Sequence, residues 1–89
     1  MKIAFRKSFA KDLRRHRKQR ELLSRIREII LEIEAAETLS SGKNLKRLKA
    51  EGPYYRIRAG NYRLGLIIEA ETVIFVRVLH RKEIYRYFP

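Results

Sequence analysis

Three arginines stand at short spacing in the second half of the chain, where their guanidinium groups could hold an anion. Arg56 and Arg58 precede Gly60-Asn61, and Arg63 follows it. A two-residue Gly-Asn turn between segments rich in aromatic and β-branched residues predicts a β-hairpin. The turn fixes the register, so that Arg58 faces Arg63 and Arg56 faces Gly65. Guanidinium groups are permanently charged and fork-shaped, which suits phosphate.

Alternation of side chains along this hairpin separates an apolar face from a basic one. The apolar face is expected to pack on helices, and its members are Tyr55, Ile57, Ala59, Tyr62, Leu64 and Leu66. The basic face carries the three arginines beside Gly65, whose missing side chain is expected to leave open space. A solvated face, with arginine stems covering the sheet, is the alternative. The direct opposition of like charges is destabilising and favours an anion site instead.

A second group of chemically capable side chains lies at the end of the sequence. His80, Arg81 and Tyr85 combine an imidazole, a guanidinium and a phenol within six residues. A histidine or tyrosine could transfer a proton, and Arg81 could stabilise charge on a phosphate. The alternative is that His80 is an ordinary strand-end residue and that Tyr85 and Tyr87 are packing residues. The residues alone leave both interpretations open.

Two helices are expected in the first half of the chain. Ile3 and Phe5 alternate with charged residues, which predicts a short strand over 2–6 that opens the chain. Ser8 is expected to cap a first helix, which the basic run from Arg14 to Arg20 ends or loops out of. A second helix is predicted over 21–37 from apolar residues at helical period, namely Leu22, Leu23, Ile26, Ile29, Ile30 and Ile33.

The second half of the chain is expected to be a connection followed by strands. Residues 38–53 contain Ser40-Ser41-Gly42 and Gly52-Pro53, so they predict a connection, with Leu45 and Leu48 as anchors. Strands are predicted over 54–59, 62–69 and 73–81, and a short helix over 82–88. The expected fold class is α+β: an antiparallel β-meander sheet packed against an N-terminal helical hairpin, in one domain spanning residues 1–89.

Composition narrows the class of protein and its partners. The 89 residues carry a net charge of +12 and no cysteine, which excludes a disulfide scaffold and a thiolate metal site. Charged residues interrupt every apolar stretch, so no membrane association is expected and the location is expected to be cytoplasmic. A positive field of this size attracts polyanions. Residues 21–40 alone are locally acidic, with two Lys/Arg and five Glu. The basic run from Arg14 to Arg20 is either a solvated surface or a sequence-independent RNA contact.

The order of elements and two motifs resemble the RelE/ParE superfamily of toxins. The first motif is Leu45-Lys46-Arg47-Leu48-Lys49 followed by Gly52-Pro53-Tyr54-Tyr55-Arg56-Ile57-Arg58-Ala59-Gly60-Asn61-Tyr62-Arg63-Leu64-Gly65. The second is Val78-Leu79-His80-Arg81-Lys82-Glu83-Ile84-Tyr85. The similarity covers nearly the whole chain and implies a RelE-like fold.

The resemblance also implies roles for individual residues. The implied catalytic set is Arg56, Arg58, Arg63, Arg81, Tyr85 and His80. In RelE-like members the basic residues of the hairpin hold the scissile phosphate. Arg56 and Arg58 stand where some members have lysines, and an arginine, with a pKa above about 12, is a poor proton acceptor. Proton abstraction is thereby left to Tyr85, His80 or the ribosome.

The activity that the resemblance implies is cleavage of messenger RNA in the ribosomal A site, by attack of a 2′-hydroxyl on the adjacent phosphate. It implies no obligatory metal or other cofactor, and it implies an acidic antitoxin that forms a hetero-oligomer with the toxin. Two alternatives stay open, because fold does not fix function: a ParE-like inhibitor of DNA gyrase, and an inactive member that acts as a binding module. The hairpin arginines with Arg81 and Tyr85 favour the nuclease, because a gyrase inhibitor does not need a phosphate-cleaving set.

Overall fold

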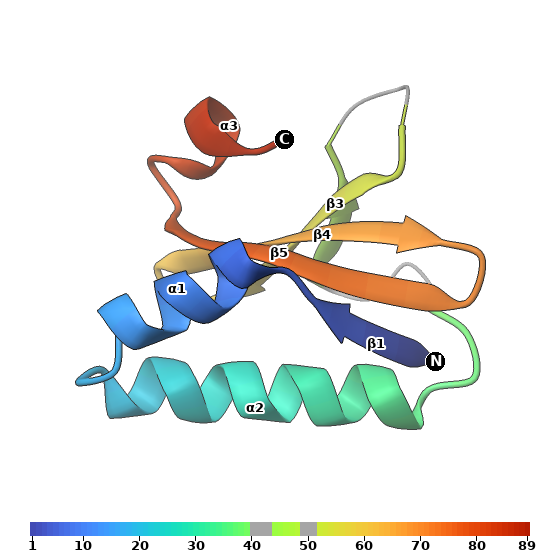
Figure 1. Cartoon of the computed structure of the whole chain (residues 1–89), viewed down its shortest axis with the longest axis horizontal. Coiled ribbons are helices and arrows are strands. Elements are labelled where there is room, and N and C mark those ends of the chain that lie inside the picture. Colours follow the sequence, from blue (N-terminus) through green and yellow to red (C-terminus); the bar gives the residue numbers. More distant parts are fainter. Residues whose placement is uncertain (40–43, 49–51) are drawn as a thin grey trace.

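The computed structural model describes residues 1–39, 44–48 and 52–89 and contains one five-stranded sheet with three helices (Figure 1). The elements are β1 (Lys2–Phe5), α1 (Lys7–Arg15), α2 (Arg20–Ala35), β2 (Leu45–Arg47), β3 (Tyr54–Ala59), β4 (Tyr62–Glu69), β5 (Thr72–His80) and α3 (Ile84–Tyr87). The strand order is β1-β5-β4-β3-β2. β1 runs parallel to β5, and the other neighbours are antiparallel. The predicted α+β class is confirmed.

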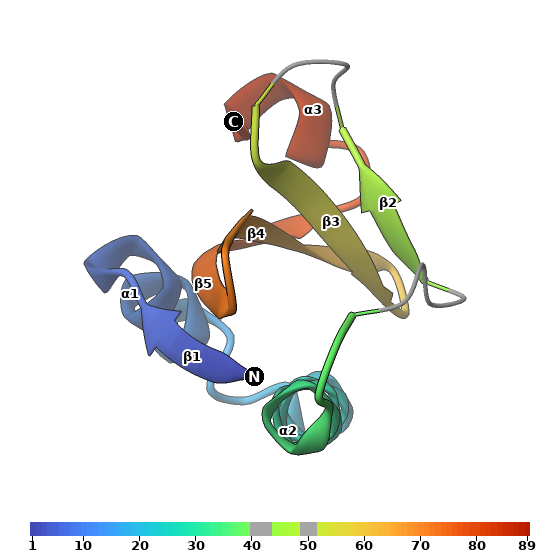
Figure 2. The same cartoon turned by 90° about the vertical axis from the view of Figure 1, so that its right-hand side faces the viewer.

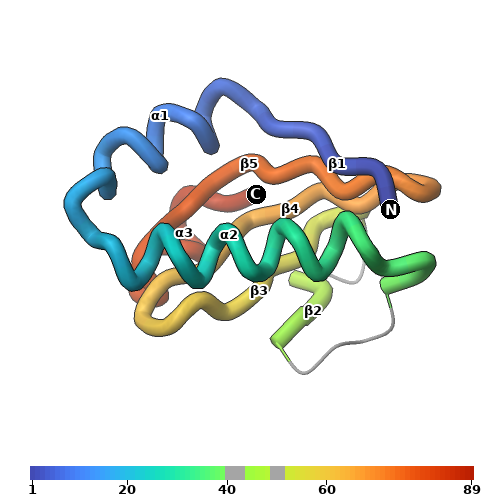
Figure 3. The backbone as a smooth tube through the Cα atoms, turned by 90° about the horizontal axis from the view of Figure 1, so that it is seen from below, coloured from blue at the N-terminus to red at the C-terminus, as the bar shows by residue number. Residues whose placement is uncertain are grey.

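The main core lies between the sheet and α2, which runs beneath the strands (Figures 1 and 3). The apolar stripe of α2 buries Leu22, Ile26, Ile29 and Ile33, as its period predicts. The sheet contributes the predicted apolar hairpin face together with residues of β5; its fully buried members are Leu64, Leu66, Val73, Phe75 and Val78. The hairpin register therefore sets which side of the sheet becomes the core.

Three local expectations were wrong or incomplete. Ser8 does not cap α1: the N-cap position belongs to Arg6, without a side-chain hydrogen bond, while the Ser8 hydroxyl donates to the carbonyl of Val76. The second helix ends at Ala35, before the predicted residue 37. Residues 45–47 form the strand β2, which is too short to show a period. The predicted Ser40-Ser41-Gly42 segment lies outside the described residues.

A second, smaller core covers the opposite face of the sheet, on the side where α3 lies (Figures 1 and 2). It buries Leu79, Ile84 and Phe88, with Leu48 packed against them, so Leu48 is an anchor as expected. Leu45 is likewise half-buried against the main core. The C-terminal segment is thus an integral part of the packing.

The Phe88 ring fills the place beside Gly65 that was expected to be open. A Cβ atom added at Gly65 would lie 2.8 Å from atoms of this ring. The Phe88 ring also packs edge-on against Tyr54, with centroids 5.9 Å apart. The expectation failed because the glycine provides a depression in which an aromatic ring is shielded from water. Gly65 therefore determines how closely the C-terminal segment approaches the sheet.

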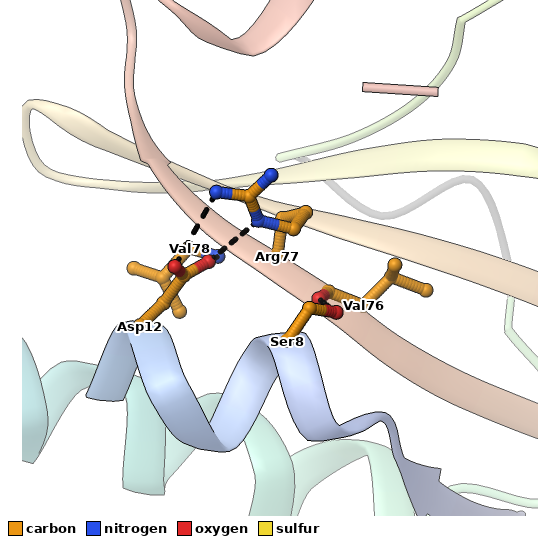
Figure 4. A network of polar contacts seen from close by, with 5 residues as sticks. All are labelled: Ser8, Asp12, Val76, Arg77 and Val78. Carbon is orange, nitrogen blue, oxygen red and sulfur yellow. Dashed lines mark hydrogen bonds and ion pairs between the residues drawn. The ribbon is translucent and has the colours of Figure 1, made fainter. Parts of the chain in front are cut away.

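The outer edge of β5 is covered by a strand in its first half and by a helix in its second. β1 pairs only with Thr72 to Phe75. Beyond that point α1 lies along the strand, and Asp12 accepts a 2.9 Å hydrogen bond from the backbone N–H of Val78 (Figure 4). The same carboxylate forms an ion pair with Arg77 at 2.8 Å. Side chains of α1 thus satisfy backbone groups that would otherwise lack a partner.

A β-bulge lies at the same place in β5. Gly65 pairs with Arg77 and Leu66 pairs with Phe75, so Val76 is the extra residue. Strict alternation would send Phe75 and Val78 to opposite faces. With the bulge, both are buried in the main core, and the alternation of every later residue in β5 is reversed.

Replacing Asp12 tests how much the α1–β5 contact contributes to stability. Breaking a buried ion pair from one side costs about 3–5 kcal/mol. We expect Asp12→Ala to lower the free energy of unfolding by about 3 kcal/mol, at the low end, because the Arg77 side chain keeps 26% exposure. Urea unfolding measures the change. Lys11→Ala, on the exposed side of α1, is the control and should stay within about 0.5 kcal/mol of wild type. An unchanged urea midpoint for Asp12→Ala would contradict this role.

Replacing Gly65 tests the contact with Phe88. Gly65→Ala should destabilise the fold by about 1–3 kcal/mol, the usual cost of overpacking, because its methyl group would overlap the Phe88 ring. A double-mutant cycle with Phe88→Leu provides the check. The two changes should be clearly non-additive, with Gly65→Ala costing less in the Phe88→Leu background. Additive effects would show that the methyl group meets something other than the ring.

Candidate functional site

The hairpin of β3 and β4 brings the predicted arginines together in the predicted register. Arg58 pairs with Arg63, and Arg56 pairs with Gly65. Gly60 has φ +63°, a left-handed conformation that glycine adopts without strain, and this permits the two-residue turn. Arg63 is half-buried, and its Nη1 donates to the carbonyls of Gly60 and Tyr62, each at 2.9 Å. These bonds hold the Arg63 guanidinium beside the turn.

The positions of the three arginines differ in depth. Arg58 is exposed, whereas Arg56 is only 8% exposed. The Nη1 of Arg56 donates to the carbonyl of Asn44 at 3.0 Å, and its Nε has no hydrogen-bond partner among the described residues. The alternation predicted that Arg56 belongs to an open basic face. The structure shows instead that its side chain is buried. It is a buried cation at the base of the cluster.

Tyr85 joins the cluster from α3, with its side chain 65% exposed. The pKa of this phenol lies below its ordinary value of 10.0, first because of a polar hydrogen-bonding contact with Arg56. The positive charges of Arg56, Lys46 and Arg63 lower the pKa further, while partial burial opposes them. Each of these cations stabilises the phenolate relative to the neutral phenol.

Positive charge is concentrated around Arg63. Its pKa is lowered, first by burial and then by the charges of Arg58, Arg56 and Arg81. Arg81, in the turn after β5, is thereby placed near the hairpin cluster, as the sequence predicted. Arginine stays charged at neutral pH, and these arginines form no ion pair with a carboxylate among the described residues, so a bound anion would relieve their repulsion. The cluster can thus hold a phosphate group and a phenolate side by side.

Sequence reasoning missed Lys46 as a member of this site. It lies on β2 directly beside Arg56, and its charge reaches Tyr85. The residue had been assigned to a connection, because a three-residue strand carries no detectable period. Its place in a Leu-Lys-rich motif just before the hairpin was the one available signal.

The structure does not bring His80 to this cluster. It pairs with Tyr62, and the two rings meet edge-on with centroids 5.5 Å apart, on the helix side of the sheet. Its Nδ1 accepts a hydrogen bond from the backbone N–H of Lys82. The bulge at Val76 explains the displacement, because it reverses the alternation of the later residues of β5. The residues gathered at the site are Lys46, Arg56, Arg58, Arg63, Arg81 and Tyr85.

Neither a metal site nor a membrane-spanning helix is present among residues 1–39, 44–48 and 52–89. No three His, Asp or Glu side chains meet there as a metal site would require. Within the same residues, none of the helices has both the length and the apolar character needed to cross a membrane.

Comparisons with known proteins identify the family. A family model described as ParE toxin of type II toxin-antitoxin system, parDE, matches residues 3–85. Toxin RelE3 of Methanocaldococcus jannaschii is 46% identical over 90 residues, covering all of both chains. A chain in the crystal structure of the RelB-RelE antitoxin-toxin complex from Methanococcus jannaschii matches with a TM-score of 0.76 and 43% identity, over 97% of this chain and 99% of that one.

A more distant match agrees in fold alone. A chain of the Escherichia coli DinJ-YafQ complex has a TM-score of 0.74 at 15% identity, over 93% of this chain and 96% of that one. The full-length match to an archaeal toxin, the family model and the shared fold agree with one another. The chain is a member of the RelE/ParE superfamily, the toxins of type II toxin-antitoxin systems.

Proposed function

We propose that this toxin is a metal-independent endoribonuclease that cleaves messenger RNA in the ribosomal A site. One observation supports this most: a phenol whose pKa is lowered by adjacent cations stands beside arginines that form no ion pair with a carboxylate among the described residues. Cleavage of RNA by its own 2′-hydroxyl needs a base for that hydroxyl and positive charge for the phosphate. The exposed parts of the cluster, Arg58 and Tyr85, can reach a large substrate such as a ribosome-bound message.

In this mechanism the phosphate lies against the exposed arginines. Arg58, Arg63 and Arg81 stabilise the negative charge that develops on its oxygens as the 2′-hydroxyl attacks phosphorus. The Tyr85 phenolate takes the proton from the 2′-hydroxyl. Arg56, buried beneath, is a positioning residue, because its contact with the phenol favours the phenolate. The bond from phosphorus to the 5′-oxygen breaks, and the leaving 5′-oxygen takes a proton from water, so the products are a 2′,3′-cyclic phosphate and a free 5′-hydroxyl end.

We also infer a protein partner and a cytoplasmic site of action. The related RelE structure is a complex with the antitoxin RelB, and the DinJ-YafQ match is a complex of the same kind. A net charge of +12 suits an acidic antitoxin, and attraction between opposite charges speeds such an association. Ribosomes and messenger RNA place the proposed activity in the cytoplasm.

A translation reaction with purified ribosomes tests the proposal. Cleaved message with a 5′-hydroxyl end is expected. A single 2′-deoxy substitution at the mapped position should abolish the cut, because the nucleophile is then missing. The cognate antitoxin should suppress cleavage. A gyrase supercoiling assay runs in parallel, and inhibited supercoiling with an intact message would replace the nuclease by the ParE-like alternative.

Arg58→Ala separates catalytic charge from stability. If Arg58 stabilises the developing negative charge, its loss should slow single-turnover cleavage by about 100-fold, as the loss of an oxyanion donor does. The free energy of unfolding should stay within about 0.5 kcal/mol of wild type, because Arg58 is exposed and its removal relieves repulsion with Arg63. Arg27→Ala, an exposed cation on α2, is the matched control and should cleave normally. Normal cleavage by Arg58→Ala would remove it from the site.

Tyr85→Phe removes only the proposed base. We expect single-turnover cleavage on saturated ribosomes to slow by at least about 10-fold, with ribosome affinity unchanged. The wild-type rate should rise with pH as the phenol ionises, and the midpoint should lie below 10.0 because the pKa is lowered. This rise should be absent from Tyr85→Phe. Tyr55→Phe, which removes a hydroxyl on the helix side of the sheet, should keep both rate and pH profile. A pH profile shared by Tyr85→Phe and wild type would reject Tyr85 as the base.

A further inference from the structure

A second group of titratable side chains lies outside the arginine cluster, around a cavity of about 480 Å³. The cavity follows the outer edge of β5, between α1 and α3, which lie on either side of that strand (Figure 1). His16 comes from the end of α1, Tyr62 from β4, His80 from β5 and Tyr87 from α3. Four rings from four parts of the chain thus line one cavity, whose volume is that of an ordinary small-molecule pocket.

Three of these rings are held in fixed relation. His16 and His80 each meet Tyr62 edge-on, with centroids 5.0 Å and 5.5 Å apart. The side-chain amide of Gln19 lies 3.1 Å from the Nδ1 of His16 and donates to the Tyr62 hydroxyl at 3.2 Å. The Nδ1 of each histidine thus lies within hydrogen-bond distance of a nitrogen, that of Gln19 for His16 and the backbone nitrogen of Lys82 for His80. The cavity therefore presents ring faces and edges together with hydrogen-bonding groups in set positions.

The charges that line the cavity cancel, although the protein is strongly basic. Arg77 is paired with Asp12 at 2.8 Å, and the remaining charged lining residues are Arg15 and Glu83. Exposed cations are instead sequence neighbours of the lining residues: Arg14, Arg17 and Lys18 next to Arg15 and His16, and Arg81 and Lys82 next to His80. This arrangement suits a ligand with a flat, neutral part and phosphates beside it. A phosphate inside the cavity would gain little, because the carboxylates of Asp12 and Glu83 offset the positive charges of Arg77 and Arg15.

We propose that the cavity receives one unpaired nucleobase of single-stranded RNA, while the cations around it contact the adjacent phosphates. Stacking on aromatic rings and hydrogen bonding to base edges are the usual means of holding such a base. His80 lies at this cavity, and Arg81, the next residue, lies at the cleavage site. One strand of RNA therefore reaches both places by passing around the end of β5. The inference rests on the proposed function only in taking RNA as the substrate class.

Histidine resonances provide a selective test, because both histidines of the chain line the cavity. The probe is a 2′-O-methyl hexanucleotide, which cannot be cleaved by 2′-hydroxyl attack. Its control is the same backbone with abasic sugars. Titration of the free toxin should shift both imidazole signals with the base-containing probe and leave them unmoved with the abasic one. Signals that stay fixed in both titrations, or that move equally in both, would overturn the proposal.

Affinity measurements on variants give an independent check. Stacking of one base contributes about 1–3 kcal/mol, so wild type should bind the base-containing probe at least about 5-fold more tightly than the abasic one. His16→Leu should bring this ratio close to one. Arg17→Ala is the matched control. It should weaken the binding of both probes and reduce the salt dependence of that binding, while the ratio of the two affinities stays that of wild type. An unchanged ratio in folded His16→Leu would count against a base in this cavity.

The outcomes separate this inference from the proposed function. Binding of a non-cleavable probe does not require ribosomes or catalysis, so histidine shifts without any message cleavage would support the cavity and reject the nuclease. Message cleavage with histidine signals that do not shift would support the nuclease and reject the base-binding cavity. If the acidic antitoxin alone moved the signals, the cavity would be a protein-docking site and the proposal would be wrong.

Discussion

The carboxylate of Asp12 against the bare edge of β5 is the interaction on which the arrangement of the C-terminal third depends. A strand edge exposes unpaired backbone groups, and β1 is long enough to cover only the part up to Phe75. Beyond Phe75, two side chains of α1 bind the backbone of β5. Asp12 accepts a hydrogen bond from the N–H of Val78, and the Ser8 hydroxyl donates one to the carbonyl of Val76. One of these contacts is made to the bulge residue Val76 itself and the other to Val78, two residues further along the strand. Side chains can hydrogen-bond to the backbone of an irregular strand, whereas a regular neighbouring strand would lose pairing there. The helix therefore satisfies the backbone groups of β5 at the bulge.

The bulge in turn decides what reaches each face of the sheet. Because Val78 turns into the main core, Leu79 turns outward and forms the smaller core with Ile84 and Phe88. That core fixes α3 above the second face and places the Phe88 ring on Gly65. Tyr85, next to the buried Ile84, is then carried on the exposed side of α3 near Arg56. A contact at one edge of the sheet is thus linked by packing to the position of the proposed base.

Features encoded locally could be predicted from the sequence, and features that depend on distant segments could not. The hairpin register followed from Gly60-Asn61, and with it the opposition of Arg58 and Arg63. The side of the sheet on which His80 lies depends on a bulge that α1 stabilises from more than sixty residues away. Likewise, the space beside Gly65 is taken by Phe88, which is far along the chain. The burial of Arg56 could not be predicted either. Strand alternation predicts on which face of the sheet a side chain lies, but it does not predict how deeply other segments bury that side chain.

The molecule handles its excess positive charge differently on the two sides of β5. Around Arg63, cations face one another without a carboxylate partner in the described contacts, and burial together with this repulsion lowers the pKa of that arginine. Around the histidine cavity, Arg77 is neutralised by Asp12, so the aromatic groups there face no uncompensated field. Repulsion that a bound phosphate would relieve makes the proposed anion binding more favourable without strengthening the free fold. A neutral cavity gains little from a phosphate and more from a stacked ring. In the proposed function, positive charge for the reacting phosphate and ring contacts for a neighbouring base are therefore separable contributions, one at the hairpin arginines and the other at the outer edge of β5.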